Sequence, residues 1–315
     1  MKNILIAGVG QIGSRYLQGL VPINLPLKIF CYDLSEQSFV VARERWQESG
    51  GLISKHKIIF LKKLENLPSN IDCAIISSGA DSRLKLASLI LEKTSVNIWI
   101  LEKLLAQNIE DLNSLSDLLD KACCYVNTPL YLSSLYFNLR EKFGNRKIDV
   151  KISGKRGIAS NAIHFIDFVS RWNNSTVISA NCRNLKNWEI YLNRPKYMEV
   201  SGSMDFNFSD GSKLHIQGSP NEDEKNNFKF SIADDRLLIE VFEEQGLAKT
   251  NNDEIISGSV LLQSELTANL ISCLLNSQVP DLPTLKQSVI QHRPLLIELT
   301  KNFKKSNNGL ALPIT

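Results

Sequence analysis

The chain has 315 residues, of which 43% are hydrophobic and 22% charged, with a formal net charge of +3. This composition is typical of a globular protein that is long enough for about two domains. The small charge and the scattered Lys and Arg residues argue against a nucleic-acid partner. No stretch approaches the roughly 20 apolar residues of a membrane span. The start, "MKNILIAGVG", is typical of a strand that runs into glycines rather than of a signal peptide, so we expect a cytoplasmic protein.

The six cysteines form neither a CxxC pair nor the Cys/His spacing of a metal site. We therefore predict that the protein has no metal site. The adjacent Cys123 and Cys124 are expected to be buried and reduced.

Short apolar segments alternate with helical ones over the first 126 residues. Strands that alternate with helices form a parallel sheet with right-handed crossovers, and the ligand of such a sheet lies at the carboxyl ends of its strands. The expected strands are 3–7, 27–32, 57–61, 71–77, 96–101 and 123–126, and the expected helices are 11–20, 38–48, 81–92 and 109–121. We predict a Rossmann domain, a doubly wound parallel sheet, over residues 1–126.

Three glycines follow the first strand in the pattern G-x-G-x-x-G: Gly8, Gly10 and Gly13. They precede a helix, and Asp33 ends the next strand 20 residues after Gly13. This context is that of a dinucleotide site. Gly8 permits the tight turn, Gly10 the close approach of a pyrophosphate, and Gly13 the packing of the helix on the strand.

The other expected cofactor contacts lie around these glycines. The backbone N–H groups at Gln11 and Ile12 open the helix and can bind phosphate. Asp33 can accept hydrogen bonds from both ribose hydroxyls and would repel a 2′-phosphate, so NAD is favoured over NADP; the alternative is that Asp33 is a helix N-cap. Ser77 and Ser78 follow the fourth strand and are expected near the cofactor's ribose or nicotinamide.

Glu102 and Lys103 end the apolar run of the expected fifth strand. They therefore lie at the edge where a parallel sheet binds its ligand. We expect Glu102 to contact the cofactor. For Lys103 the alternative is a surface lysine paired with Glu102.

The pattern changes after residue 126. A strand at 147–153 leads into a helix that ends near Trp172, and two hairpins follow at 198–219 and 227–245. The loop 219–227 is polar. Helices at 257–276 and 284–303 are expected to close the chain. We predict an α+β domain over 127–315 with an open, mainly antiparallel sheet, and the alternating apolar residues at 204–208 and 228–232 suggest that its open face is an oligomer surface.

The segments 8–20, 72–92, 100–106, 161–172 and 282–300 resemble the Gfo/Idh/MocA family of nicotinamide-dependent sugar oxidoreductases over nearly the whole chain. "EK" at 102–103 is similar to the family's Glu-Lys-Pro signature. The resemblance implies that Lys103 is the acid/base beside the substrate's reacting hydroxyl, that His164 assists the proton transfer, and that Ser160 and Asn161 also contact the substrate. It further implies a homodimer or homotetramer, and relatives in bacterial surface-sugar biosynthesis.

The sequence departs from the family pattern at three positions: Leu104 replaces proline, Ser160 replaces aspartate, and Tyr16 replaces a frequent histidine. The predicted function is hydride transfer between NAD and a hydroxyl or keto carbon of a sugar or sugar nucleotide. The alternative is an NAD(H)-binding protein with weak or no catalysis, such as a redox sensor or an assembly partner. A reductase of this fold acting on another substrate, such as a tetrapyrrole, is a third interpretation.

Two more features are left open by the sequence. Asp167 lies one turn after His164 and either orients it or is solvated. Lys155 and Arg156 either belong to a solvated loop or meet a substrate phosphate or carboxylate.

Overall fold

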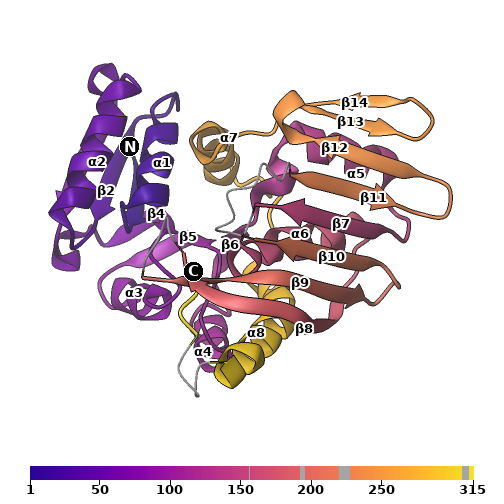
Figure 1. Cartoon of the computed structure of the whole chain (residues 1–315). Helices are drawn as coiled ribbons and strands as arrows, with labels where there is room; N and C mark the ends of the chain where they lie inside the picture. Colours follow the sequence, from indigo (N-terminus) through magenta and orange to yellow (C-terminus); the bar gives the residue numbers. More distant parts are fainter. Residues whose placement is uncertain (156, 192–195, 220–227, 307–311) are drawn as a thin grey trace. The chain divides into compact units, whose positions relative to one another are not determined.

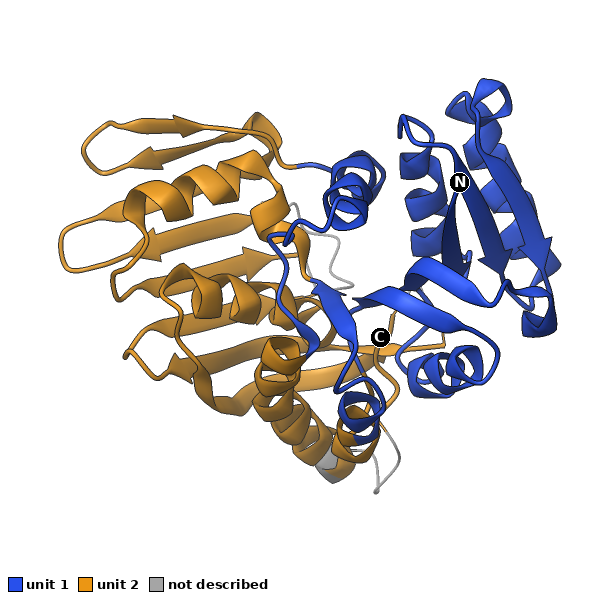
Figure 2. Cartoon of the chain, turned by 180° about the vertical axis from the view of Figure 1, so that it is seen from behind, with its two compact units in different colours: residues 1–105, 114–127, 261–285 blue, residues 106–113, 128–260, 286–315 orange. Residues whose placement is uncertain are grey.

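The computed structural model describes the chain except for residues 156, 192–195, 220–227 and 307–311. Arg156 and most of the expected polar loop 219–227 therefore lie outside the described residues. The chain forms two compact units, coloured separately in Figure 2. Unit 1 comprises 1–105, 114–127 and 261–285, and unit 2 comprises 106–113, 128–260 and 286–315. The sequence suggests a single boundary after residue 126, whereas the units interleave along the chain.

Unit 1 is built on a six-stranded parallel sheet in the order β3-β2-β1-β4-β5-β6. Its strands are β1 Lys2–Ala7, β2 Leu27–Tyr32, β3 Lys57–Leu61, β4 Asn70–Ile76, β5 Ser95–Glu102 and β6 Cys123–Asn127. Its helices are α1 Gln11–Leu20, α2 Glu36–Glu48, α3 Arg83–Leu91 and α7 Gln263–Leu275. Helix α4, Ile109–Leu118, spans the division between the units. Short 3-10 turns lie at Gly51–Ile53 and Leu64–Asn66. This confirms the predicted doubly wound sheet.

The strand order reverses between β1 and β4, the neighbours at the centre of the sheet. Because the crossovers are right-handed, α1 and α2 lie on one face and α3 on the other (Figure 1). The loops after β1 and β4 therefore meet at the carboxyl end of the sheet, where such folds bind ligands.

The late segment 261–285 completes unit 1. Helix α7 packs against α1 so closely that a Cβ on Gly19 would lie 2.3 Å from the Ser264 carbonyl oxygen. The backbone N–H of Val126 donates to the carbonyl of Pro283 (3.0 Å), beside the edge strand β6.

The expectation that Cys123 and Cys124 are both buried is wrong for one of them. Cys124 is buried, but Cys123 is exposed, because successive side chains of β6 point to opposite faces of the sheet. All six cysteines are free thiols.

Unit 2 contains an eight-stranded sheet in the order β14-β13-β12-β11-β7-β10-β9-β8. Strands β7 and β10 pair in parallel and the other neighbours are antiparallel. The strands are β7 Asp149–Gly154, β8 Val177–Ile190, β9 Met198–Phe208, β10 Lys213–Gly218, β11 Lys229–Ala233, β12 Leu238–Phe242, β13 Leu247–Thr250 and β14 Ile255–Ser257. The helices are α5 Ser134–Phe143, α6 Ile158–Trp172 and α8 Leu285–Ser306, with 3-10 turns at Pro129–Leu132 and Glu243–Gln245.

Helices cover one face of this sheet, as Figure 2 shows from behind. The apolar residues of the strands point into that covered side, and Phe230 packs edge-on against Phe168 of α6 with 5.3 Å between the ring centroids. The alternate residues on the open face are polar: Asp205, Lys151, His215, Ser231 and Glu240. The alternating pattern at 204–208 and 228–232 is therefore satisfied within one chain, and it does not require a second copy.

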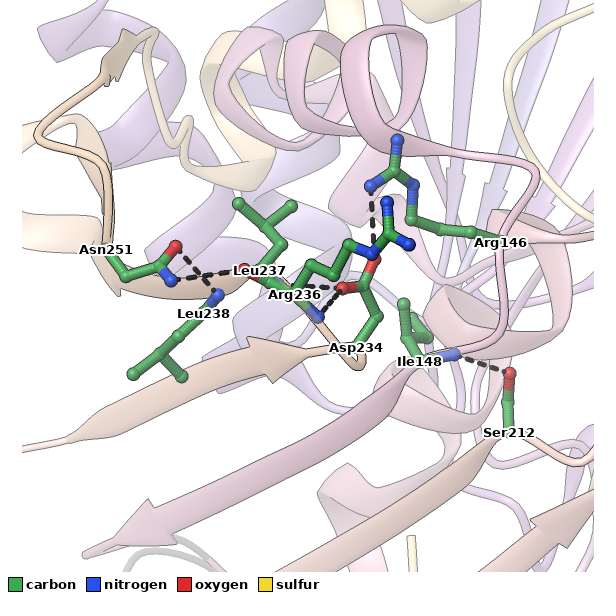
Figure 3. A network of polar contacts seen from close by, with 8 residues as sticks. All are labelled: Arg146, Ile148, Ser212, Asp234, Arg236, Leu237, Leu238 and Asn251. Carbon is green, nitrogen blue, oxygen red and sulfur yellow. Dashed lines mark hydrogen bonds and ion pairs between the residues drawn. The ribbon is translucent and has the colours of Figure 1, made fainter.

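The hairpin predicted at 227–245 is formed by β11 and β12, and its turn lies at Asp234 (Figure 3). The Asp234 carboxylate accepts hydrogen bonds from the backbone N–H groups of Arg236 (2.8 Å) and Leu237 (2.7 Å) and pairs with Arg146 (3.0 Å). Partial burial alone would raise the pKa of the Asp234 carboxyl, but these donors outweigh it and lower that pKa. The carboxylate thus holds the turn and ties it to the segment that precedes β7.

Candidate functional site

The three glycines after β1 occupy three different environments, which match the roles that the sequence predicted. Gly8 has φ +93°, and a Cβ on it would lie 2.8 Å from the Ser78 backbone nitrogen. A Cβ on Gly13 would lie 1.9 Å from the Gly8 carbonyl oxygen, so α1 packs directly on the loop. A Cβ on Gly10 would meet no atom within 4 Å. Gly10 therefore faces open space, as a glycine beside a pyrophosphate must.

Helix α1 begins at Gln11 without a side-chain cap at Gly10. Its first intrahelical bond is from the Ser14 N–H to the Gly10 carbonyl (3.0 Å), so the N–H groups of Gln11 and Ile12 precede the hydrogen-bonded part of the helix. Arg45 of α2 donates to the Gln11 carbonyl (2.9 Å) and to its Oε1 (2.7 Å), which fixes the helix start. An uncapped helix N-terminus beside open space fits an anionic group.

Asp33 follows β2 and ties two loops together. Its Oδ2 accepts from the Val9 N–H (2.8 Å) and its Oδ1 from the Ser35 N–H (2.9 Å). The N-cap of α2 is Ser35, whose Oγ accepts from Ser38, so Asp33 is not the cap that the alternative interpretation proposed. The carboxylate instead lies where the glycine loop meets the end of β2.

A pocket of about 460 Å³ joins these groups at the carboxyl end of the sheet. It brings together five of the predicted cofactor residues; Gln11, Ile12, Gly13 and Glu102 are not in its wall. Its lining comprises Gly8, Gly10, Tyr32, Asp33, Leu34, Ser77, Ser78, Gly79, Ser82, Lys85, Leu86 and Leu89. Ser77 also donates its hydroxyl to the Gly8 carbonyl (2.6 Å), so it supports the loop as well as lining the pocket.

Glu102 ends β5 and is only 6% exposed. Its Oε1 accepts from the Tyr16 hydroxyl (2.7 Å) and from Asn127 Nδ2 (2.6 Å). Burial and the neighbouring Glu102 raise the pKa of Tyr16 well above its usual value. The alternative interpretation, in which Lys103 forms a surface ion pair with Glu102, is therefore wrong about Glu102: this carboxylate is buried and accepts hydrogen bonds from Tyr16 and Asn127. Lys103 is half-buried, and its peptide bond to Leu104 is cis.

Arg83 is a residue of this region that our reading of the sequence missed. It opens α3, is 1% exposed, and donates from Nη2 to the Ser78 carbonyl (2.5 Å) in the pocket wall. A cation at a helix N-terminus is repelled by the positive end of the helix dipole. That unfavourable position, next to the expected cofactor loop, is the signal that could have drawn attention to Arg83.

In unit 2, His164 lies in the middle of α6 and is half-buried. Ser160, one turn earlier, is buried, and Asn161 donates from its Nδ2 to the Gly157 carbonyl (2.8 Å) and to Ser160 Oγ (3.0 Å). The predicted residues therefore share one helix, and the two polar ones contact each other at its first turn.

A second missed residue, Glu199 of β9, holds the start of α6. It is 1% exposed, and its two oxygens accept from the backbone N–H groups of Ala159 (3.0 Å) and Ser160 (2.9 Å). A Cβ on Gly157 would lie 2.1 Å from the Glu199 carboxyl carbon, so glycine is needed there. The first turn that lacks a carboxylate in the sequence, at Ser160, thus receives one from a distant strand.

Asp167 is fully buried, which excludes the solvated interpretation. Its Oδ1 accepts from Gln291 Nε2 (2.9 Å), and Arg171 lies 3.7 Å from its Oδ2. Lys103 belongs to unit 1, whereas His164, Ser160 and Asn161 belong to unit 2, so their joint action stays a prediction.

Metal binding and membrane insertion are two other properties on which the described residues bear. Within the part of the chain that the structure describes, no group of three or more His, Cys, Asp and Glu side chains is placed to hold a metal ion. None of the described helices is long and apolar enough to cross a membrane.

No family model and no curated protein matches the sequence, but solved structures match the fold. Scyllo-inositol dehydrogenase from Lactobacillus casei, with bound NAD(H) and scyllo-inositol, shares 13% identity over 97% of this chain and 98% of its own (TM-score 0.68). Biliverdin reductase from Synechocystis, in complex with biliverdin and NADP+, shares 14% identity over 94% of this chain and 97% of its own (TM-score 0.69). UDP-N-acetylglucosamine 3-dehydrogenase from Acidithiobacillus ferrooxidans shares 13% over 95% of each chain (0.67).

These matches extend over almost the whole of each chain, and they include both the parallel sheet of unit 1 and the mixed sheet of unit 2. At such low identity a likeness concerns the fold and not the reaction. The chain therefore has the fold of Gfo/Idh/MocA-type oxidoreductases, as the resemblance of its motifs implied.

Proposed function

We propose that this protein is an NAD-dependent oxidoreductase that transfers a hydride between nicotinamide and a hydroxyl or keto carbon of a sugar or sugar nucleotide. The observation that carries the proposal is the glycine loop of unit 1. Gly10 faces open space at an uncapped helix start, while Gly8 and Gly13 are in close contact with their surroundings. The residues present therefore fit a dinucleotide.

The bound cofactor would supply the hydride chemistry, and the protein the binding and the proton handling. The N–H groups at Gln11 and Ile12 would hold the pyrophosphate, and Asp33 would accept from the adenosine ribose. Asp33 disfavours a 2′-phosphate through its charge, which supports NAD over NADP. The solved structure with NAD(H) and that with NADP+ show that the fold accommodates both forms of cofactor.

Lys103 is the proposed acid/base, and His164 the group that assists it. Lys103 directly follows the buried Glu102 at the carboxyl edge of the sheet, where ligands of this fold bind. A lysine amine that is partly removed from water can act as a base near neutral pH. Ser160 and Asn161, in the first turn of the helix that carries His164, are proposed to contact the substrate.

The proposed substrate class rests on the relatives in fold. Scyllo-inositol and UDP-N-acetylglucosamine are the substrates named for two of them, and both carry ring hydroxyls. Biliverdin reductase keeps a tetrapyrrole as the second candidate substrate, because its fold matches equally well. The remaining alternative is an NAD(H)-binding protein without turnover, which Ser160 and Leu104 motivate.

Cofactor titration tests the proposal first. Calorimetry of the purified protein, checked for co-purified nucleotide by denaturing a sample, should show NADH binding more tightly than NADPH. Tight NADPH binding would refute the role of Asp33, and a demonstrably empty protein that binds neither would refute the oxidoreductase. Turnover of a panel of sugars, sugar nucleotides and biliverdin then separates the three alternatives.

Replacing Lys103 tests the catalytic assignment. Lys103→Met should lower turnover about 100-fold or more, because a general acid/base group is lost. Lys121→Met, at an exposed lysine, is the matched control and should leave turnover unchanged. An unchanged rate in the Lys103 variant would remove this lysine from the mechanism.

We also propose a homodimer or homotetramer, as the family resemblance implies. The polar, open face of the unit 2 sheet is the surface proposed for it. Sedimentation at micromolar concentration tests this, and a monomer there would contradict it.

A further inference from the structure

A chain of hydrogen-bonded polar side chains, most of them buried, crosses the carboxyl end of unit 1. Glu102 Oε1 accepts from the Tyr16 hydroxyl and from Asn127 Nδ2, and the same Nδ2 donates to Gln263 Oε1 (2.8 Å). The four residues come from β5, α1, β6 and α7. Tyr16 is 0% exposed and Asn127 3%. Residues of α1 and β6 therefore donate to a carboxylate of β5, and a residue of α7 accepts from the one on β6.

This network leaves two acceptor atoms over. Both contacts of Glu102 are made by Oε1, so Oε2 accepts no hydrogen bond among the described residues. Asn127 Oδ1 is buried and likewise has no partner in that part of the chain. Glu102 Oε2 is not among the fully enclosed atoms without a partner, so a donor from a ligand or from water can reach it. The site therefore suits a ligand that offers a hydroxyl or N–H group to this oxygen.

The position of Glu102 and Asn127 in the sheet indicates which half of a dinucleotide would lie beside them. Glu102 and Asn127 are register partners at the ends of β5 and β6. The pocket of the glycine loop and Asp33 lies at the ends of β1, β2 and β4, and β5 is the next strand along the same edge. An extended dinucleotide whose adenosine half occupies that pocket has its second ribose and carboxamide left for the β5 side.

We propose that Tyr16, Asn127 and Gln263 are positioning residues that hold Glu102 so that its Oε2 accepts from a hydroxyl of the nicotinamide-side ribose. This rests on the proposed function, because it assumes a nicotinamide dinucleotide. Tyr16 is essential to the arrangement, since its hydroxyl is the donor that reaches Glu102 from across the sheet. Without it the carboxylate keeps only Asn127 and can turn away.

The test separates the two halves of the dinucleotide. NADH and ADP are titrated by calorimetry into the full-length wild type and into Tyr16→Phe, which removes a single oxygen. NADH affinity should fall about tenfold, the size of one lost hydrogen bond to a charged group. ADP affinity should be unchanged, because ADP has no second ribose. Tyr125→Phe, on β6 but outside the network, is the matched control and should change neither affinity.

Gln263→Met provides a second variant in case Tyr16→Phe does not fold. Gln263 is half-exposed and terminates the network, so its loss should weaken NADH severalfold and spare ADP. Equal losses for NADH and ADP would mean a merely structural role and overturn the inference. Unchanged NADH affinity in both variants would overturn it as well. A wild type that binds neither nucleotide would instead refute the proposed function, and the inference with it.

Discussion

Gly10 and Gly13 belong to one motif but should respond to the same substitution in opposite ways. Gly10 has φ −64° and open space around its Cβ position, so alanine is conformationally permitted there. At Gly13 the added carbon would lie 1.9 Å from the backbone of Gly8. Gly10 thus leaves room for a ligand, whereas Gly13 permits the packing of α1 on the loop.

We predict that Gly10→Ala leaves the free energy of unfolding of the ligand-free protein within about 1 kcal/mol of the wild type. Its NADH affinity should fall at least about tenfold, because the methyl group fills the space meant for the pyrophosphate. Gly13→Ala should lower the urea midpoint clearly even without ligand. Urea unfolding and calorimetry on both variants measure this, and wild-type NADH binding by Gly10→Ala would contradict the assigned phosphate site.

Residues whose role follows from local spacing could be predicted from the sequence. Gly8, Gly10, Gly13 and Asp33 act within one strand-turn-helix-strand unit, so their pattern is readable along the chain. The partners of Glu102 could not be predicted in this way, because Tyr16 lies 86 residues away in the sequence and Asn127 lies 25 residues away. Their contact exists only because the sheet brings the ends of separate elements together.

The start of α6 depends on a carboxylate from β9. Glu199 accepts hydrogen bonds from two backbone N–H groups that the helix itself cannot satisfy. Its negative charge also interacts favourably with the positive end of the helix dipole. Gly157 makes room for it. The position of Ser160 and His164 on this helix therefore depends on β9.

Glu199→Ala should lower the free energy of unfolding by about 1–3 kcal/mol, because two buried N–H groups lose their acceptor. Amide hydrogen exchange at Ala159 and Ser160 should accelerate more than exchange in the middle of α6. Glu240→Ala, at an exposed glutamate on the open face of the same sheet, is the control and should have little effect. Wild-type stability and exchange in the Glu199 variant would show that the helix start is held by other contacts.

Which elements the sequence revealed depended on their length and regularity. The six parallel strands were predicted because each contains a short apolar run that ends in a turn or polar segment. The helix α5 was missed although its buried residues Leu135, Leu139 and Phe143 recur at helical spacing, since the segment also contains polar side chains. The expected helix 257–276 begins only at Gln263, because Ile255–Ser257 forms the edge strand β14 with three residues. Such short strands are specified by their neighbours rather than by their own pattern.

The path of the chain through the two units decides which parts of it can fold alone. Unit 1 contains 261–285 in addition to its N-terminal segments, and α7 in this stretch packs against α1. Gln263 also joins the network around Glu102. The sequence could not show this, because α7 has an ordinary helical pattern and its partner lies more than 200 residues away.

A fragment of residues 1–127 should therefore not fold into a stable domain, although the sequence pattern alone suggests that it ends at a boundary. Without α7 the face of α1 around Gly19 would be exposed, and Val126 would lose the Pro283 carbonyl. Joining residues 261–285 to the fragment through a flexible linker should restore a cooperative thermal transition in circular dichroism, together with NADH binding. If the fragment 1–127 alone unfolds cooperatively and binds NADH as tightly as the full chain, then α7 is an accessory of unit 1 and not part of its core.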